Sequence, residues 1–448
     1  MFLNGFLDLI SLFKNIYFSI SKKRDLITIY PLYLDYSKSF CMAATVRRKK
    51  RNARRYLLCD VISQFGSGMS FVSLNWFVFQ KTGDSNSVGI VMLLGILGGV
   101  IAAFFAGAIS DHFNRKSILV FSNFLRALFI SVIICFMSYN QFNILFAYLL
   151  AFVGGLGLHV YMSASRAFMQ ELIDQKDIVR WQSFIEVSIQ ASMLVSGLLT
   201  GILYNLFGIK VILGIEVLSF FVSNILLYTI EHESLVYKTV KDRLIHKYAQ
   251  GYHNLRSHVW MFIFAVIMVL PYVATVMLNT VMPHYVSNHL GSDVVMYGIM
   301  NMSYGVGGGM AGLVIMYVLS KYSHVASINI CLSVGVMALM FLFFNRDAMV
   351  SSPLFFFFGL SNSSIKIILN SILMKNVSNE YMGRALSVVS LTSAVLQMLA
   401  TYVVSVMIDR YIGLNSIIFL VLVMAVSYGC FVWYLPKYRK YLQKRVSV

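Results

Sequence analysis

Charged residues are scarce in this sequence. Aspartate, glutamate, lysine and arginine together make up 12% of its 448 residues, and 58% of the residues are hydrophobic. A soluble globular domain carries about 25% charged residues. This composition excludes a soluble globular protein, and it predicts an all-α polytopic membrane protein that works within a lipid bilayer.

The low numbers of acidic residues and cysteines, and the absence of catalytic motifs, exclude several classes of function. Lysine and arginine number 36 against 18 acidic residues, but the basic residues lie in short segments between apolar runs. This placement indicates membrane topology and not a nucleic-acid-binding face. The five cysteines show no paired spacing that would predict a disulfide framework or a zinc site. The sequence also has no Gly-x-Ser-x-Gly elbow, no His-Glu-x-x-His and no nucleotide-binding loop, so we expect neither an enzyme nor a bound cofactor or metal.

Long apolar runs divide the chain into two halves. At about 20 helical residues per crossing, each half has six predicted spans, and a polar linker at 231–258 separates the halves. The fold that we expect is therefore twelve transmembrane helices in two pseudo-symmetric six-helix bundles, at 56–230 and 259–435, with a basic tail at 436–448. The predicted spans are Tyr56–Gln80, Val88–Ile109, Ile118–Ser138, Phe142–Ser165, Gln182–Leu206, Val211–Ile230, Val259–Met282, Val294–Leu319, Val325–Phe344, Pro353–Met374, Ala385–Ile408 and Ser416–Leu435.

The distribution of lysine and arginine predicts the orientation of the spans. Most of these residues lie in the loops that share a side with both termini and the linker, so we expect both termini and the linker to be cytoplasmic. We expect residues 1–55 to form a cytoplasmic N-terminal extension, whose part at 1–41 differs in character and is not expected to belong to the working transporter. Met42 begins a short basic segment that leads into the first span, so Met1 and Met42 are both candidate translation starts. An interfacial helix or a thirteenth span are the alternatives for residues 2–20.

The segment AGAISDHFNRKS lies between the second and third predicted spans. It places Gly107 and Asp111 one helical turn apart, and Arg115 with Lys116 on the far side of a short turn. Glycine allows two helices to approach closely, and the charges around the turn indicate a transporter gate; the alternative is an ordinary basic cytoplasmic turn. We expect Asn114 to adopt a positive φ in this turn, because asparagine tolerates that conformation better than other non-glycine residues.

The two halves resemble each other at an offset of 204 to 205 residues, which is what duplication of a six-helix unit would leave. At this offset Gly312 falls opposite Gly107, whereas Met316 stands where an equivalent of Asp111 would be. We therefore predict that the charge of the gate belongs mainly to the first half.

Polar residues repeat at helical spacing along one face of seven predicted spans. This pattern predicts a polar-lined cavity ringed by helices of both halves. The alternative is that these residues only join helices by hydrogen bonds. The third, sixth, ninth and twelfth spans show no comparable stripe. The residues that we expect to line the cavity are Gln64, His159, Gln190, Asn279, Asn301, Asn362 and Gln397.

A few charges lie inside the predicted spans, where each costs at least about 2.5–3.5 kcal/mol at the bilayer centre. Asp60, Glu186 and Lys366 fall on the polar stripes. An acid near a base in a partly dry cavity can bind and release a proton according to which side is open, so we predict Asp60 and Glu186 as the proton-coupling residues. An ion pair that only fastens helices is the alternative. It is the favoured interpretation for Arg126 and Glu216, which lie on spans without a stripe.

From residue 54 to about 435 the sequence resembles the major facilitator superfamily, and within it the bacterial macrolide-efflux and enterobactin (siderophore) exporter group. The motifs that carry this resemblance are LLCDVISQFGSGMSFVSLNWFVFQKTGDSNSVG, AGAISDHFNRKS, FLRAL, SASRAFMQELIDQKDIVRWQS, EVLSFFVSNILL and EYMGRALSV. The resemblance implies alternating access by two rocking bundles, usually driven by inward proton movement. It also implies the gate role of Gly107, Asp111, Arg115 and Lys116.

The sequence departs from the pattern of that family at four positions. In the gate segment, His112 and Asn114 replace the usual arginine and glycine. Gly197, in SGLLTG, stands where exporters of this superfamily usually carry proline. Asn123 stands where relatives often have an acid before FLRAL, so Arg126 lacks its usual neighbour.

The leading functional prediction is a secondary transporter of the bacterial inner membrane that exports an amphipathic small molecule, a drug or a siderophore, by proton antiport. A cavity rich in aromatic residues and methionine, with few fixed charges, suits such a ligand. The expected partners are the small-molecule substrate, protons and the bilayer, and one chain already contains both halves, so we expect a functional monomer. The alternatives are an importer of a small metabolite or ferric siderophore, and a transport-inactive membrane assembly partner.

Overall fold

The computed structural model describes residues 30–139, 143–173, 178–231, 259–376, 379–410 and 416–446. Side chains are described in these ranges except in short stretches, which include 30–47, 106–112, 182–190 and 373–388. The chain divides into two compact units, Met1–Arg54 and Arg55–Val448. In the first unit the described residues are helical. All the predicted spans belong to the second unit, and most of the linker predicted at 231–258 lies outside the described residues.

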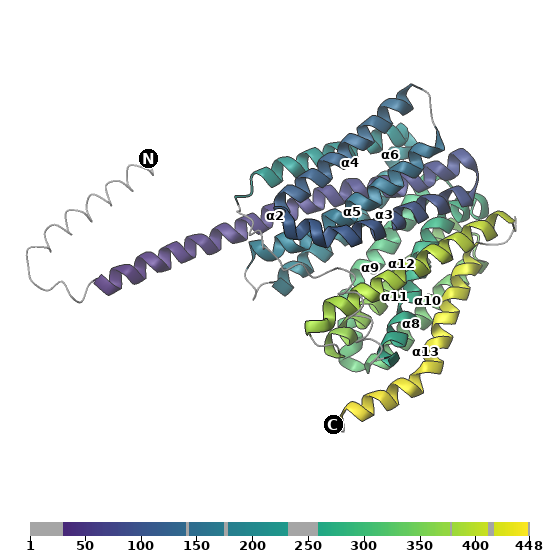
Figure 1. The fold of residues 1–448 in the computed structure, drawn as a ribbon. Helices are drawn as coiled ribbons and strands as arrows, with labels where there is room; N and C mark the ends of the chain where they lie inside the picture. The colour runs from purple at the N-terminus through teal and green to yellow at the C-terminus, as the bar shows by residue number, and fades with distance from the viewer. Residues whose placement is uncertain are drawn as a thin grey trace, which may run out of the picture. The chain divides into compact units, whose positions relative to one another are not determined.

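Every long element of the described chain is a helix (Figure 1). Eleven of the described helices are long and apolar enough to cross a membrane. α13 continues beyond the predicted end of the last span and takes in most of the predicted basic tail. The helices are α2 (Tyr30–Thr82), α3 (Ser85–His112), α4 (Arg115–Ser138), α5 (Ile144–Leu172), α6 (Ile178–Tyr228), α8 (Val259–His284), a short π-helical turn (Tyr285–His289), α9 (Val294–Lys321), α10 (His324–Phe344), α11 (Ala348–Asn376), α12 (Asn379–Arg410) and α13 (Ile417–Val446).

Helix α6 contains both the fifth and the sixth predicted spans, which reconciles eleven helices with twelve predicted crossings. Its backbone breaks at Gly208, where φ is 73° and ψ is −176°. Ser192 on the first arm donates to the carbonyl of Val61 in α2, and Ser223 on the second arm donates to the carbonyl of Cys59. The two arms therefore run along α2 in opposite directions, as a hairpin. Glycine adopts a positive φ readily, so the chain turns here without a loop.

The helix caps repeat between the two halves. Asp84 accepts hydrogen bonds from backbone N–H groups in the first turn of α3, and Asp293 does the same for α9, 209 residues later. Asn114 caps α4 and Ser323 caps α10, at the same separation. Because caps satisfy the free N–H groups at the start of a helix, these pairs define the helix boundaries of a repeated unit.

The sequence match at an offset of 204 to 205 residues is wrong for α3 and α9. At the offset of 209 that the caps define, the counterpart of Gly107 is Met316 rather than Gly312, and the counterpart of Asp111 is Ser320. At α5 and α11 the offset falls to 204, because the first residues of these helices are that far apart. The change of five residues arises because α4 is three residues longer than α10 and the connection that follows it is two residues longer than its counterpart.

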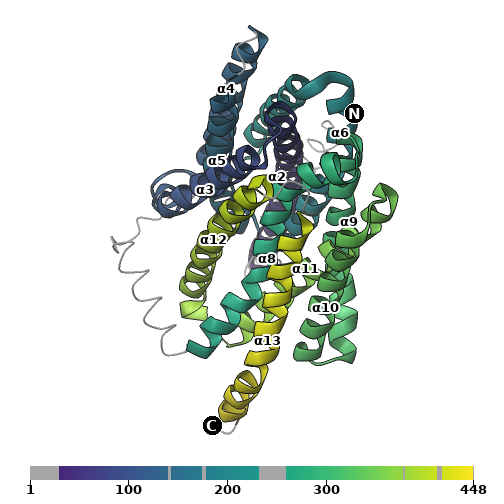
Figure 2. The same ribbon diagram turned by 90° about the vertical axis from the view of Figure 1, so that its right-hand side faces the viewer.

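Helices pack in matching pairs within each half (Figure 2). In the first half α3 packs on α5, and α4 packs on α5 and α6; in the second half α9 packs on α11, and α10 packs on α11 and α13. A Cβ on Gly155 of α5 would overlap the carbonyl oxygen of Gly95 in α3. A Cβ on Gly359 of α11 would overlap the carbonyl oxygen of Tyr304 in α9 in the same way. Backbones in close contact are the usual reason for glycine inside membrane helices.

The halves meet through α3 with α8 and α12, and through α6 with α9. A Cβ on Gly201 would lie 2.9 Å from the carbonyl oxygen of Val294, and the ring centroids of Trp76 and Tyr297 are 5.3 Å apart. These contacts lie toward the membrane end that contains Gly208, which we call the Gly208 end. The opposite end, where α3 is joined to α4, is called the Arg115 end.

Candidate functional site

The predicted gate turn contains a helix cap. Asn114 has φ −58° and ψ 122°, and its side chain accepts a hydrogen bond from the backbone N–H of Lys116 at 3.0 Å. The expectation of a positive φ at Asn114 is therefore wrong. The turn is closed by a side-chain cap, for which asparagine is among the preferred residues, and needs no left-handed residue.

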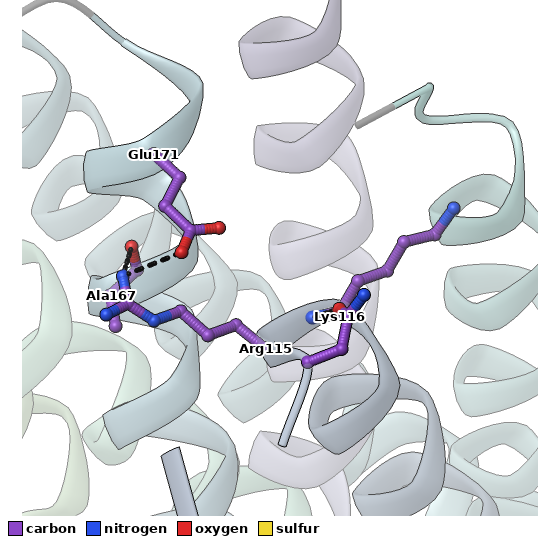
Figure 3. Close-up of polar contacts among 5 residues, drawn as sticks. Arg115, Lys116, Ala167 and Glu171 are labelled. Carbon is purple, nitrogen blue, oxygen red and sulfur yellow. Dashed lines mark hydrogen bonds and ion pairs between the residues drawn. The ribbon is translucent and has the colours of Figure 1, made fainter. Parts of the chain in front are cut away.

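Arg115 connects the turn to the end of α5. Its Nη1 donates to the carbonyl of Ala167 at 2.9 Å and lies 3.1 Å from Oε1 of Glu171, as Figure 3 shows. The side chains of Arg115 and Glu171 are 18% and 7% exposed. Glu171 was not singled out as a site residue from the sequence, although it lies in SASRAFMQELIDQKDIVRWQS; the pairing is a contact between two helices that spacing along the chain does not reveal.

Lys116 extends in the opposite direction, to the end of α6 (Figure 3). Its Nζ donates to the carbonyl of Ile230 at 2.8 Å, and Nη1 of Arg55 donates to the carbonyl of Thr229 at 2.9 Å. Cations near the last carbonyls of a helix satisfy these groups and interact favourably with its dipole. The two cations of the turn therefore tie α4 to both α5 and α6. The backbones of Gly107 and Asp111 belong to α3, but their side chains lie outside the described ones.

The pairing of Arg115 with Glu171 predicts a measurable coupling. Arg115→Gln and Glu171→Gln should each lower the stability of the purified protein by about 1–2 kcal/mol, and the double variant should lose little more than either single one. Thermal unfolding in detergent measures the three variants and Lys116→Gln, a control that leaves the ion pair intact. Losses that simply add in the double variant would contradict the pairing.

A second group of polar side chains is buried among α2, α4, α5 and α6. Arg126 of α4 is 4% exposed. It donates from Nη2 to Oδ1 of Asn123 at 2.7 Å and from Nη1 to the hydroxyl of Ser67 at 3.3 Å. Its guanidinium also lies over the ring of Phe220, 4.2 Å from the centroid. Asn123 thus contacts Arg126 although it is not the acid that relatives often have at this position.

The acidic neighbours of Arg126 come from other helices. Asp60 of α2 is 1% exposed and Glu216 of α6 is 6% exposed, and both interact electrostatically with Arg126. Tyr161 of α5 adjoins Asp60, and its ring lies 5.4 Å from the guanidinium carbon of Arg126. We call these four residues, together with Asn123, the Arg126 cluster. Spacing along the chain identified its charged residues one by one, but it did not predict Tyr161 or the gathering of two carboxyl groups near one guanidinium.

The second half has an uncharged polar cluster at α8, α9 and α11. The amide of Asn362 donates to the hydroxyl of Thr275 and, at 3.3 Å, to the hydroxyl of Tyr304. One helical turn later on α11, Nζ of Lys366 lies 5.8 Å from the ring centroid of Tyr272 on α8. The structure thus brings together members of the predicted stripes of three spans.

The remaining residues predicted for the cavity do not form one cluster. Asn301 donates to the carbonyl of Tyr297, and Gln397 donates to the hydroxyl of Ser393, each within its own helix. His159 is exposed and contacts the carbonyl of Gly155 through Nδ1. Gln64 and Asn279 are half-buried, and the side chains of Glu186 and Gln190 lie outside the described ones. Among the described residues, no three His, Cys, Asp or Glu side chains are placed to hold a metal ion.

Comparison with known proteins places this arrangement in a family. The sequence pattern of the Major Facilitator Superfamily matches residues 56–401. Macrolide efflux protein A of Streptococcus pyogenes is 19% identical over 348 residues, which cover 76% of this chain and 84% of that protein.

Solved transporter structures share the fold. The nucleoside transporter NupG has a TM-score of 0.69 at 12% identity, covering 86% of this chain and 99% of its own. A bacterial homologue of the iron transporter ferroportin in an inward-facing state has a TM-score of 0.69 at 13% identity, covering 86% and 98%. The D-xylose-proton symporter has a TM-score of 0.65 at 13% identity, covering 85% and 96%.

Proposed function

Because this chain belongs to the Major Facilitator Superfamily, we propose that it exports an amphipathic small molecule, a drug or a siderophore, across the bacterial inner membrane in exchange for protons. The chain is a multi-pass membrane transporter and not an enzyme. Its similarity to macrolide efflux protein A supports the outward direction.

The proposed orientation places the Arg115 end in the cytoplasm. Arg55, Arg115 and Lys116 gather at this end, and lysine and arginine favour the cytoplasmic side of membrane proteins. With this orientation, the contacts between the halves at the Gly208 end close the extracytoplasmic side. Cargo then enters between the halves from the cytoplasm, and rocking of the two halves delivers it to the other side.

The Arg126 cluster is the observation that carries the proton-coupling part of the proposal. Asp60 and Glu216 both lie near the guanidinium of Arg126 in the interior of the first half, although neither forms an ion pair with it. Two carboxylates with one cation leave an unbalanced negative charge, which is costly away from water, so uptake of one proton neutralises the cluster. Asp60 is the proposed carrier, because it lies on the polar stripe of α2. Glu186, predicted from the sequence for the same role, is kept as the second candidate.

The gate residues have a separate proposed role. Gly107 and Asp111 end α3, and Arg115 and Lys116 tie the following helix to α5 and α6. We propose that this set holds the Arg115 end of the first half together as one rigid body while the halves rock.

Vesicles of both orientations test the direction and the coupling. Inverted membrane vesicles with an acidic interior should accumulate rhodamine 6G or 8-anilinonaphthalene-1-sulfonate, and nigericin, which collapses the pH difference, should abolish this accumulation. Asp60→Asn should lower proton-driven accumulation at least about tenfold, because the carboxyl group that binds the proton is gone, while dye exchange without a gradient continues. Asp60→Glu is the matched control that keeps the carboxyl group. Proton-driven uptake into right-side-out vesicles instead would indicate import.

A further inference from the structure

Lys366 lies within a candidate membrane span, and its charged side chain is exposed. It belongs to the candidate span Ala348–Leu369 of α11 and is exposed. Its Nζ lies 5.8 Å from the ring centroid of Tyr272, which is 44% exposed on the candidate span Val266–His289. Among the described side chains, no carboxylate lies within ion-pair distance of Lys366. In the described part of the chain, a cation with no acidic partner and an exposed aromatic ring thus lie side by side within the candidate spans.

The position of Lys366 on α11 shows that it faces the interior of the transporter. Asn362, one turn earlier on the same face, contacts Thr275 of α8 and Tyr304 of α9. Gly359 packs on the backbone of Tyr304. A charge that faced lipid at this depth would be strongly disfavoured, whereas the face of α11 that carries Asn362 and Lys366 is turned toward α8. Lys366 therefore adjoins the path of the cargo.

The charge of Lys366 is less engaged by the protein than that of Arg126, the buried arginine of the first half. Arg126 is 4% exposed and already donates to Ser67 and Asn123. Its charge is engaged by the protein, whereas Nζ of Lys366 has three donors and, among the described side chains, adjoins Tyr272 alone. A ligand that offers an anionic group to Nζ and an apolar or aromatic body to the ring would satisfy both side chains.

We propose that Lys366 and Tyr272 form the recognition site for the anionic group and the adjoining ring of an aromatic organic anion, such as a carboxylate, sulfonate or phenolate. This inference rests on the export function proposed above and names its substrate class. The uncharged cluster of Asn362, Thr275 and Tyr304 next to the site supplies hydrogen bonds without adding a charge. An inside-negative membrane potential also favours the exit of an anion, so one fixed cation on the route matches outward transport.

Two fluorescent ligands that differ by one charged group test the proposal. 8-Anilinonaphthalene-1-sulfonate carries a sulfonate, and N-phenyl-1-naphthylamine is the same ring system without it. Binding is measured by equilibrium dialysis against the full chain in phosphatidylcholine nanodiscs, with empty nanodiscs as the background. Lys366→Gln should weaken binding of the sulfonate about tenfold, the scale of one charge-assisted contact. It should change binding of the neutral ligand less than about twofold.

Three further variants control the experiment. Lys366→Arg keeps the charge and should retain binding of the sulfonate within about threefold, and Tyr272→Leu should weaken both ligands alike. Lys321 lies over the ring of Tyr317 at 4.4 Å, but both belong to the last turns of α9, so Lys321→Gln should have no effect. The proposal is overturned if the wild-type protein binds no sulfonate above background, if Lys366→Gln leaves the ratio of the two affinities unchanged, or if Lys321→Gln has the same effect.

The binding result is independent of the transport result. If the vesicles show no proton-driven accumulation but the nanodiscs show a Lys366-dependent preference for the sulfonate, the export function fails and the recognition site stands. If the vesicles accumulate dye and Lys366→Gln changes neither affinity, the export function stands and the recognition site fails.

Discussion

Replacing Gly155 with valine is expected to remove most folded protein from the membrane. A Cβ at this position overlaps the carbonyl oxygen of Gly95 in α3, and a backbone atom cannot move aside as a flexible side chain can. α3 and α5 must then separate along their shared face. We expect a loss of at least about 3 kcal/mol, the upper part of the range for overpacked cores. The yield of monodisperse protein after gel filtration, and its thermal midpoint in detergent, measure the effect.

The neighbouring residue provides a matched control for Gly155→Val. A Cβ on Gly154 would meet no heavy atom within 4 Å, so Gly154→Val should leave the yield and the thermal midpoint close to those of the wild type. Gly359→Val in α11 should repeat the loss, because it overlaps the backbone of Tyr304 in the equivalent place. Equal behaviour of the Gly154 and Gly155 variants would contradict the close approach of α3 and α5.

Replacing Arg126 with methionine is expected to have the second largest effect. Methionine keeps much of the length of the side chain but removes the only positive charge near Asp60 and Glu216 among the described residues of the cluster. Breaking a buried charge pair by removing one partner costs about 3–5 kcal/mol, because the remaining charge is left uncompensated. Denaturation of the purified variant in detergent should therefore show a loss of this size.

Removing the acids as well should restore much of what Arg126→Met loses. In the triple variant with Asp60→Asn and Glu216→Gln the cluster is neutral, and Asn123 and the neighbouring Ser67 still offer hydrogen bonds. Restoration of at least half of the lost stability would identify charge as the cause. A triple variant as unstable as Arg126→Met alone would show instead that packing of the arginine on Phe220 and Gly157 dominates.

The number and position of the membrane spans follow from the sequence because burial in lipid is a local property. A run of about 20 apolar residues must cross the bilayer whatever its neighbours do, and each predicted span falls in a helix. The backbone conformation of Asn114 could not be predicted, because asparagine is common both as a helix cap and as a residue with positive φ. Only the backbone geometry distinguishes them, and it shows a cap.

The contacts between distant helices could not be predicted from the sequence. Arg126 lies on a span without a polar stripe. Its neighbours Ser67 and Phe220 come from α2 and α6, which are distant in the sequence. Lys366 and Tyr272 are 94 residues apart, and their contact was not predicted. Hydropathy and periodicity predict which face of a helix is polar, but not which other helix packs on that face. The neighbouring helix decides whether a charge has a partner within the protein or is open to a ligand.

The hairpin of α6 also bears on how the chain enters the membrane during synthesis. Ala191–Tyr228 is an apolar run of 38 residues, about 57 Å long if it were one straight helix, against a hydrocarbon thickness of about 30 Å. Gly208 folds this run so that it crosses twice. A chain that crossed only once here would insert each later helix in the reverse direction, because every crossing inverts the next. The relative orientation of the two halves therefore depends on a single residue that folds the chain back on itself.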